Sequence, residues 1–118
     1  MPKFEVEFYQ NSKGKEPVQE FLLSLDSKMR AKMLGMISLL QEYGNDLREP
    51  YSKYLSDGIF ELRAKQGSDI SRVLYFFCIG QTIILTNGFI KKTQKTPQAE
   101  IDRAKRYRAE YLRREKKG

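Results

Sequence analysis

The sequence predicts an α+β fold in which an antiparallel sheet is combined with two N-terminal helices and a C-terminal helix. Three observations lead to this prediction. A short alternating segment opens the chain, residues 18–43 show helical spacing, and three apolar segments separated by hairpin-length turns occupy residues 59–89. At 118 residues and 40% hydrophobic content, the chain is expected to form one domain spanning residues 1–118.

The first half of the chain is predicted to hold one strand and two helices. In KFEVEFY (3–9), apolar residues alternate with glutamate and a final tyrosine, which is the period of a half-buried strand. VQEFLLSL (18–25) predicts a short helix. Asp26 or Ser27 can cap a longer one, and Gly44 can end it. Its apolar residues recur at three- and four-residue spacing and are expected to fill the core: Met29, Met33, Ile37 and Leu40.

The second half is predicted to hold three strands and a helix. Residues 45–58 read as a polar connection, because Pro50 and SDG (56–58) are turn signals. The strands are predicted at 59–64, 71–79 and 82–89, joined by KQGSD and GQ. Thr96 and Pro97 are predicted to start the last helix. Its apolar stripe is Ile101, Ala104, Tyr107 or Arg108, and Tyr111.

Composition excludes several classes of site. The chain has no histidine, so a zinc centre or a histidine-based catalytic triad is not expected, and neither a metal nor a cofactor is predicted. The single cysteine, Cys78, lies in an apolar segment and is expected to be an inert, buried thiol. No apolar run approaches the roughly 20 residues that span a bilayer, and the N-terminus lacks the apolar core of a signal peptide. We therefore expect a cytoplasmic protein that does not contact a membrane.

The net charge of +7 is placed unevenly. Residues 1–90 carry 11 basic and 11 acidic side chains, whereas residues 91–118 carry 11 basic and 4 acidic ones. The excess begins in GFIKKTQKTP (88–97), where lysines and threonines follow an apolar strand with no carboxylate among them. Such asymmetry indicates a nucleic acid or an acidic protein as partner. For the last eight residues alone, a solubilising tail is the alternative interpretation.

The predicted strands bring distant cations to one edge of the sheet. Glu61 and Arg63 are two residues apart and therefore share a face. Arg72 starts the next antiparallel strand across a short turn, so it is expected near Arg63. If the third strand pairs with the second, Lys91 and Lys92 emerge beside the start of the second strand. Four like charges so gathered cost stability unless an anion binds or Glu61 neutralises them in part.

A phosphodiester suits such a site. Arginine offers a planar fork to two phosphate oxygens, and cations fixed in advance stabilise the charge that phosphorus gains during cleavage. RNA supplies its own nucleophile, the 2′-hydroxyl, so RNA cleavage needs neither a histidine nor a metal. A lysine or Glu61 would then move the proton, or electrostatic stabilisation alone would suffice. Tyr75 or Tyr107 could stack on a base, although both are expected to be packing residues.

These segments resemble a known family. FELR, SRVLYFF and IILTNGFIKKTQKTPQAEIDRAKRYRAEY are similar to the phage-derived, HigB-like branch of the RelE toxin superfamily, most strongly over residues 59–111. The resemblance implies a small RelE-like domain and the toxin of a type II toxin–antitoxin system. It implies an endoribonuclease, an mRNA interferase, that cuts mRNA on the ribosome and thereby inhibits translation. The implied partner is a HigA-like helix-turn-helix antitoxin, expected in a heterotetramer, and operator DNA would be bound only through that antitoxin.

The resemblance also implies roles for individual residues. Arg63 and Arg72 match positions where the superfamily places phosphate-contacting cations, and Lys91 and Lys92 follow the strand after which relatives place a catalytic residue. Glu61 stands where some relatives have a lysine. It is a candidate for proton transfer, and a salt bridge to Arg63 or Arg72 is the equal alternative. The residues expected to bind RNA around this centre are Lys65, Lys95 and Arg106.

Two other functions remain open from the sequence. The basic edge and the last helix could hold RNA or DNA without cutting it, or the cationic end could dock an acidic protein. The clustering at one sheet edge favours the two nucleic-acid functions, and the resemblance favours the nuclease.

Overall fold

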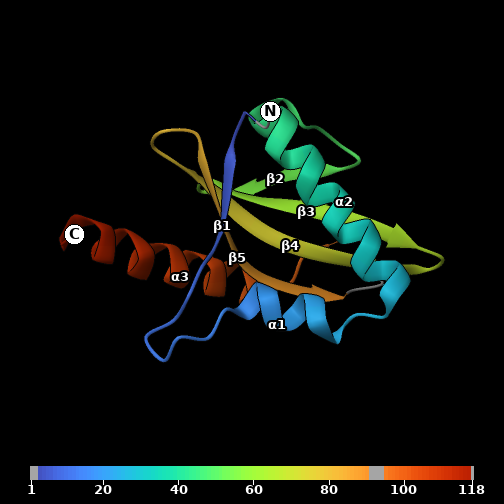
Figure 1. Cartoon of the computed structure of the whole chain (residues 1–118), viewed down its shortest axis with the longest axis horizontal. Coiled ribbons are helices and arrows are strands. Elements are labelled where there is room, and N and C mark those ends of the chain that lie inside the picture. Colours follow the sequence, from blue (N-terminus) through green and yellow to red (C-terminus); the bar gives the residue numbers. More distant parts are fainter. Residues whose placement is uncertain (1–2, 91–94, 118) are drawn as a thin grey trace.

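The computed structural model describes residues 3–90 and 95–117 and confirms the α+β fold. Figure 1 shows the elements in their spatial arrangement. In chain order they are β1 (Glu5–Phe8), α1 (Pro17–Ser24), α2 (Ser27–Tyr43), a 3₁₀ turn (Gly44–Asp46), β2 (Ser52–Ser56), β3 (Ile59–Gln66), β4 (Asp69–Cys78), β5 (Thr82–Ile90) and α3 (Gln98–Lys117). No helix in the described part of the chain is long and apolar enough to cross a membrane.

The five strands form one sheet in the order β1-β5-β4-β3-β2. The neighbours from β5 to β2 are antiparallel, as predicted for the hairpin core. β1 joins the edge beside β5 and runs parallel to it, from Glu5 opposite Thr82 to Phe8 opposite Leu85. In the sequence, α1 and α2 lie between β1 and the other four strands. They provide the long connection that a parallel pair of strands requires.

The prediction that residues 45–58 form only a polar connection was wrong, because β2 lies within them. β2 pairs with β3 from Ser52 opposite Leu62 to Ser56 opposite Ile59. Asp57 and Gly58 form the two-residue turn between them, both with positive φ, which matches the twist of the flanking strands. The turn was predicted, but the strand before it was missed, since an exposed edge strand is largely polar and lacks a clear hydrophobic pattern.

The helices cover the two faces of the sheet separately, as Figure 1 shows. α1 and α2 cover one face, where the predicted methionine stripe of α2 is buried against Leu62, Val73, Tyr75, Ile83 and Leu85. α3 covers the other face, where Ala104 packs with Ile59, Leu74, Phe76, Ile84 and Tyr9. Because helices cover both faces of the sheet, its central strands carry apolar side chains on both faces.

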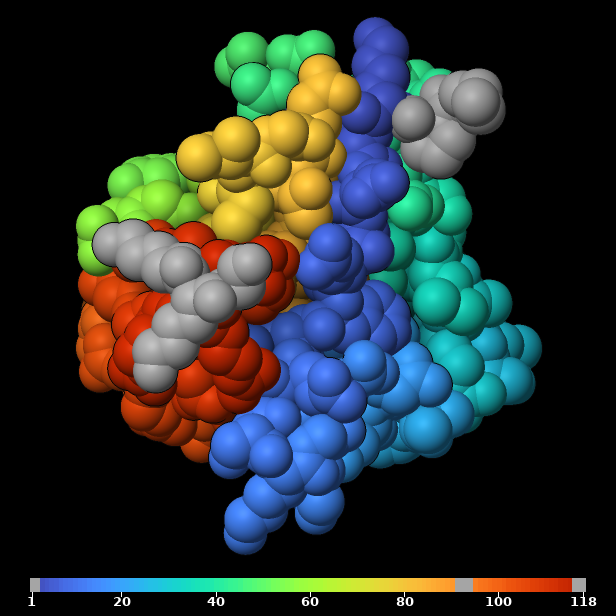
Figure 2. Space-filling view, turned by 60° about the vertical axis from the view of Figure 1, so that its left-hand side comes forward, coloured from blue at the N-terminus to red at the C-terminus, as the bar shows by residue number. Residues whose placement is uncertain are grey.

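Two details at the ends of elements differ from the predictions. Tyr9, expected on the polar side of β1, is buried, because α3 lies over that side and Tyr107 stacks on the Tyr9 ring with centroids 4.4 Å apart. Figure 2 shows α3 side by side with the N-terminal segment. α3 begins at Gln98, and the hydroxyl of Thr96, predicted to cap it, donates to Glu61. The predictions for α2 are confirmed, with Asp26 accepting from the Met29 N–H at 2.8 Å and Gly44 at the C-cap.

Two glycines at α2 give a prediction on stability. Gly44 has φ +51°, and a Cβ there would lie 2.1 Å from a ring atom of Phe4, whereas a Cβ at Gly35 within the helix would meet nothing within 4 Å. Gly44→Ala should therefore lower the free energy of unfolding by about 1–3 kcal/mol. Gly35→Ala should raise it by roughly 0.5–1 kcal/mol, because glycine is a poor helix former. Urea denaturation of both variants checks this, and equal changes of the same sign would contradict the packing described at Gly44.

Candidate active site

The two arginines predicted to meet are direct neighbours across two strands. Arg63 of β3 is the register partner of Arg72 of β4, because the turn between the strands fixes the pairing from Gln66 opposite Asp69 inward. Residues directly opposite on a sheet have Cβ atoms about 5 Å apart, so this register places two positive side chains on the same face. Like charges at that separation require a compensating anion.

The carboxylate of Glu61 provides this compensation. Glu61 precedes Arg63 by two residues on β3 and is fully buried on the same face. Arg63 Nε donates to Glu61 Oε1 at 2.6 Å, and Arg72 Nε lies 3.9 Å from the same oxygen. The hydroxyl of Thr96 donates to the other oxygen, Oε2. We call these four residues, Glu61, Arg63, Arg72 and Thr96, the Glu61 cluster; it carries two positive charges and one negative charge.

The two arginines differ in exposure. The side chain of Arg72 is fully buried, whereas that of Arg63 is 15% exposed. Burial lowers the pKa of the Arg72 guanidinium; Glu61 raises this pKa and Arg63 lowers it further. Arginine nevertheless remains protonated at neutral pH, because its ordinary pKa lies far above 7. Arg63 is therefore the guanidinium of the pair that an anion in solvent can reach, and Arg72 adds positive potential from behind it.

The basic segment after β5 is described only in part. Ile90 is the register partner of Ser71, so β5 ends beside the start of β4, next to Arg72. Lys91 and Lys92, predicted to emerge at this point, lie outside the described residues, and their placement and roles stay predictions. Lys95 is described and exposed. It borders a cavity of about 320 Å³ between β2 and α3 together with Lys53 and Thr96.

The remaining predicted RNA-binding residues are divided between two places. Lys65 is exposed on β3, two residues beyond Arg63 and on the same side of the strand. Arg106 is exposed on α3 and lies over the ring of Tyr107, with its Cζ 5.6 Å from the ring centroid. No contact described for residues 95–117 joins Arg106 to the Glu61 cluster. The structure thus brings Glu61, Arg63 and Arg72 together. Arg106 lies on α3, against Tyr107.

The two tyrosines considered for base stacking occupy packed positions. Tyr75 is buried on the face covered by α1 and α2, and its hydroxyl shares a hydrogen bond with Ser52. Burial raises the pKa of Tyr75 to about 12. Tyr107 stacks on Tyr9 beneath α3. Both are packing residues, in agreement with the expectation from the sequence.

Sequence reasoning missed two members of this region. Thr96 was predicted as a helix cap, and no local signal links it to Glu61, which lies 35 residues away. Lys53 was assigned to a loop, although it is the β2 partner of Glu61 and therefore lies on the same face of the sheet. Polar and apolar residues do not alternate over SKYL (52–55), so the sequence carries no clear signal that places Lys53 on a strand.

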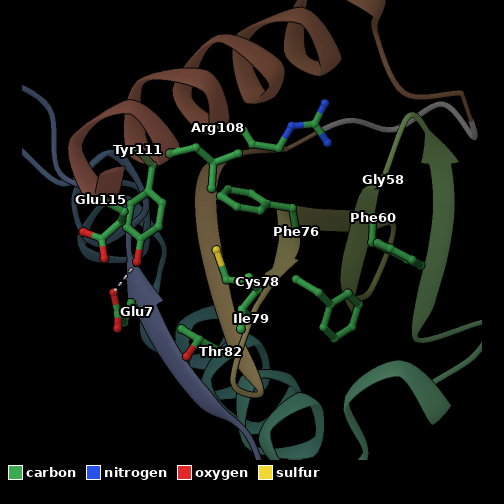
Figure 3. Close-up of a pocket in the computed structure, with 12 residues that line it drawn as sticks. Glu7, Gly58, Phe60, Phe76, Cys78, Ile79, Thr82, Arg108, Tyr111 and Glu115 are labelled. Carbon is green, nitrogen blue, oxygen red and sulfur yellow. Dashed lines mark hydrogen bonds between the residues drawn. The ribbon is translucent and has the colours of Figure 1, made fainter. Parts of the chain in front are cut away.

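A second pocket lies at the opposite end of β4 and differs in chemistry. It has a volume of about 740 Å³ and is lined mainly by apolar side chains, among them Phe76 and Leu112. Figure 3 shows Tyr111 of α3, hydrogen-bonded to Glu7 of β1, along one side of it. Cys78 lines this pocket, about 20 Å along β4 from Arg72 at 3.4 Å per residue. Burial raises the pKa of the Cys78 thiol, which keeps it protonated and unreactive at neutral pH.

Metal ligands are not gathered anywhere in the described residues, since no group of three or more cysteine, aspartate or glutamate side chains could hold an ion there. The Glu61 cluster offers fixed cations and a hydrogen-bonded carboxylate.

Comparison with known families identifies the chain. The family model described as phage derived protein Gp49-like (DUF891) matches residues 20–109. The chain belongs to this family. The matched range of the Gp49-like chain contains the Glu61 cluster, Lys53 and the first half of α3, and it omits β1. No match was found among curated proteins.

The buried carboxylate gives a prediction on stability. Glu61→Gln removes the carboxylate that lies against both Arg63 and Arg72, so it should lower the free energy of unfolding by about 3 kcal/mol. Glu110→Gln is the matched control, because Glu110 pairs with Arg114 on the surface of α3 and such pairs contribute about 0–1 kcal/mol. Urea denaturation measures both. A Glu61 variant as stable as the Glu110 variant would show that the cluster does not depend on its carboxylate.

Proposed function

We propose that this chain is the toxin of a type II toxin–antitoxin system and an mRNA interferase that cuts mRNA on the ribosome. The observation that carries the proposal is the direct pairing of Arg63 with Arg72 over the buried Glu61 carboxylate. The Gp49-like family supports it, since this phage-derived, toxin-like family is related to RelE- and HigB-type toxin–antitoxin proteins.

The proposed reaction uses the nucleophile that RNA carries. The 2′-hydroxyl loses its proton and attacks the adjacent phosphorus, which becomes pentacoordinate with increased negative charge. The bond to the 5′-oxygen of the next nucleotide then breaks and that oxygen takes up a proton, which leaves a 2′,3′-cyclic phosphate and a 5′-hydroxyl. Arg63, at the exposed side of the cluster, binds the equatorial oxygens, and the positive potential of Arg72 stabilises the added charge. Such stabilisation is greater in the transition state than in the ground state, which is what accelerates the reaction.

Glu61 acts in this proposal as a positioning residue for Arg63. Both of its oxygens already accept hydrogen bonds, from Arg63 and from Thr96, and its side chain is fully buried. A carboxylate held in this way fixes the direction of the guanidinium fork and does not contact solvent or RNA. The proton transfers are then assigned to Lys91 and Lys92, which the sequence places directly after β5.

The proposal extends to partners and place of action. mRNA on the ribosome is the substrate, so the toxin acts in the cytoplasm and needs no cofactor. The partner that silences it is a helix-turn-helix antitoxin of the HigA kind, in a heterotetramer, and operator DNA is bound through that partner. The excess of basic residues after position 90 supports a polyanionic substrate.

A second candidate function is RNA binding without cleavage. The full burial of Arg72 favours it, because a guanidinium without exposed surface cannot contact a phosphate unless the site rearranges. The two functions differ in the fate of the RNA: binding alone leaves mRNA intact on ribosomes even at saturating protein.

The test is growth and mRNA integrity on induction of the chain alone in bacteria. We expect growth arrest, relieved by Arg63→Ala and by Arg72→Ala, and a fall in the rate of mRNA cleavage by about 100-fold or more for either variant. Arg103→Ala is the control, since Arg103 forms an exposed pair with Glu100 on α3 and should leave the arrest unchanged.

Circular dichroism separates loss of chemistry from loss of fold, and Arg63→Gln, at the more exposed position, provides a second variant if Arg72→Ala does not fold. Normal growth with folded wild-type chain, or intact mRNA in arrested cells, would contradict the nuclease function.

A further inference from the structure

A groove lies between α2 and the free end of β3, next to the Glu61 cluster. Its volume is about 660 Å³, within the range of roughly 300–1,000 Å³ that small-molecule sites occupy. Met36, Leu39 and Ala64 contribute apolar surface, and Arg63 lines the groove as well as the cluster. We call it the α2–β3 groove. It has no role in the function proposed above.

We propose that the α2–β3 groove binds one nucleotide of single-stranded RNA beside the phosphate held by Arg63, with the base on Tyr51 and a neighbouring phosphate on Lys32 and Lys65. The inference rests on the proposed function for the identity of the polyanion. It adds a subsite that selects the base at the position of cleavage.

The charges of the groove match a phosphate backbone. Lys32 of α2, Lys65 of β3 and Arg63 are the three cations among its lining residues, and Lys32 and Lys65 are exposed. The side chains of Arg63 and Lys65 leave β3 on the face of Glu61, whereas Lys32 belongs to the helix that covers the other face. No carboxylate occurs among its described lining residues. Because Arg63 also donates to Glu61, the cation at the inner end of the groove belongs to the cluster that would hold the scissile phosphate. A chain of phosphates that leaves Arg63 would therefore pass Lys65 and turn around the free edge of β3 to reach Lys32.

The apolar part of the groove matches a base. Tyr51 is 50% exposed, and it precedes β2 at the mouth of the groove. An aromatic ring left open to solvent beside apolar side chains offers a stacking platform, and stacking tolerates every base because each has a π-face. Leu39 is also exposed and lies on the α2 side. A flat apolar ligand with charged ends fits this combination, whereas a purely apolar ligand would make no use of the cations that line the groove.

The edge of β3 provides groups that can read the base. β2 pairs with β3 only as far as Ser52 opposite Leu62, after which the Arg63 N–H donates to the Tyr51 carbonyl. Along a strand, backbone groups of alternate residues point to the same side, so the N–H and carbonyl of Lys65 point toward the groove. One donor and one acceptor beside a stacked base can distinguish its hydrogen-bonding edge.

Gly35 keeps the groove open. It lies within α2, lines the groove and has nothing within 4 Å of the position that a Cβ would take. Helix geometry does not require glycine there, and glycine costs about 0.5–1 kcal/mol in a helix relative to alanine. A residue that packing does not explain and that widens a groove supports a ligand in that groove.

The test uses the full chain, prepared by cell-free synthesis, and a trinucleotide of 2′-O-methyl RNA, which can bind but lacks the attacking hydroxyl. Amide chemical shifts in a titration locate the ligand, and we expect the largest changes at Gly35, Tyr51 and Lys65. Tyr51→Ala should raise the Kd about tenfold, since one base–aromatic stack is lost. Gly35→Leu should fill the groove and weaken binding to a similar degree.

Matched controls are available within the chain. Tyr43 is 52% exposed at the end of α2 and does not line the groove, and Lys28 is an exposed lysine one turn before Lys32. Tyr43→Ala and Lys28→Ala should leave the Kd almost unchanged, whereas Lys32→Ala should raise it several-fold and reduce its salt dependence. The proposal would be overturned if the chemical-shift changes lay outside the groove. It would also be overturned if Tyr43→Ala and Tyr51→Ala weakened binding equally. A groove that binds an acidic peptide and not RNA would overturn it as well.

Cleavage is measured separately on ribosome-bound mRNA, so that the two proposals can fail independently. If the trinucleotide binds in the groove but the wild-type chain does not cleave mRNA, the subsite is supported and the nuclease function is contradicted. Cleavage by Tyr51→Ala with an unchanged pattern of cut bases, at unchanged KM, would support the nuclease and overturn the subsite.

Discussion

The arrangement of this molecule depends on one buried carboxylate. Glu61 lies at the centre of four elements: its own strand β3, the neighbouring β4 through Arg72, β2 through the register partner Lys53, and the segment before α3 through Thr96. A buried charge is costly unless hydrogen bonds and opposite charges surround it, and here both are present. The same carboxylate permits two arginines to face each other across a strand pair, which is the feature that makes the edge cationic.

Apolar packing and cationic side chains lie at opposite ends of the sheet. At the end where β4 closes into β5, α3 packs on β1 through Tyr9, Tyr107 and Tyr111, and the pocket there is apolar. At the end where β4 begins, the side chains are cationic and two cavities open beside the Glu61 cluster.

The pairing of Arg63 with Arg72 could be predicted because only local information was needed. A short turn between two apolar strands fixes the register, and alternation then fixes the face. Thr96 could not be placed, since its contact with Glu61 depends on how α3 settles on the sheet. β2 and the burial of Tyr9 were missed for related reasons: an edge strand has a weak hydrophobic pattern, and the cover over β1 comes from a helix that follows about 90 residues later in the sequence. Lys91 and Lys92 lie outside the described residues, so that part of the site stays a prediction.

The chemistry of the cut ends tests the central claim most directly. Ribosome-bound mRNA is treated with the purified chain, and the termini are identified by mass spectrometry, with a parallel substrate that carries one 2′-deoxy nucleotide at the mapped position. Attack by the 2′-hydroxyl predicts a 2′,3′-cyclic phosphate on one fragment, a 5′-hydroxyl on the other, and no cut at the deoxy position. A 5′-phosphate, or cleavage that persists at the deoxy nucleotide, would show that water supplies the nucleophile, and would contradict the proposed attack by the 2′-hydroxyl.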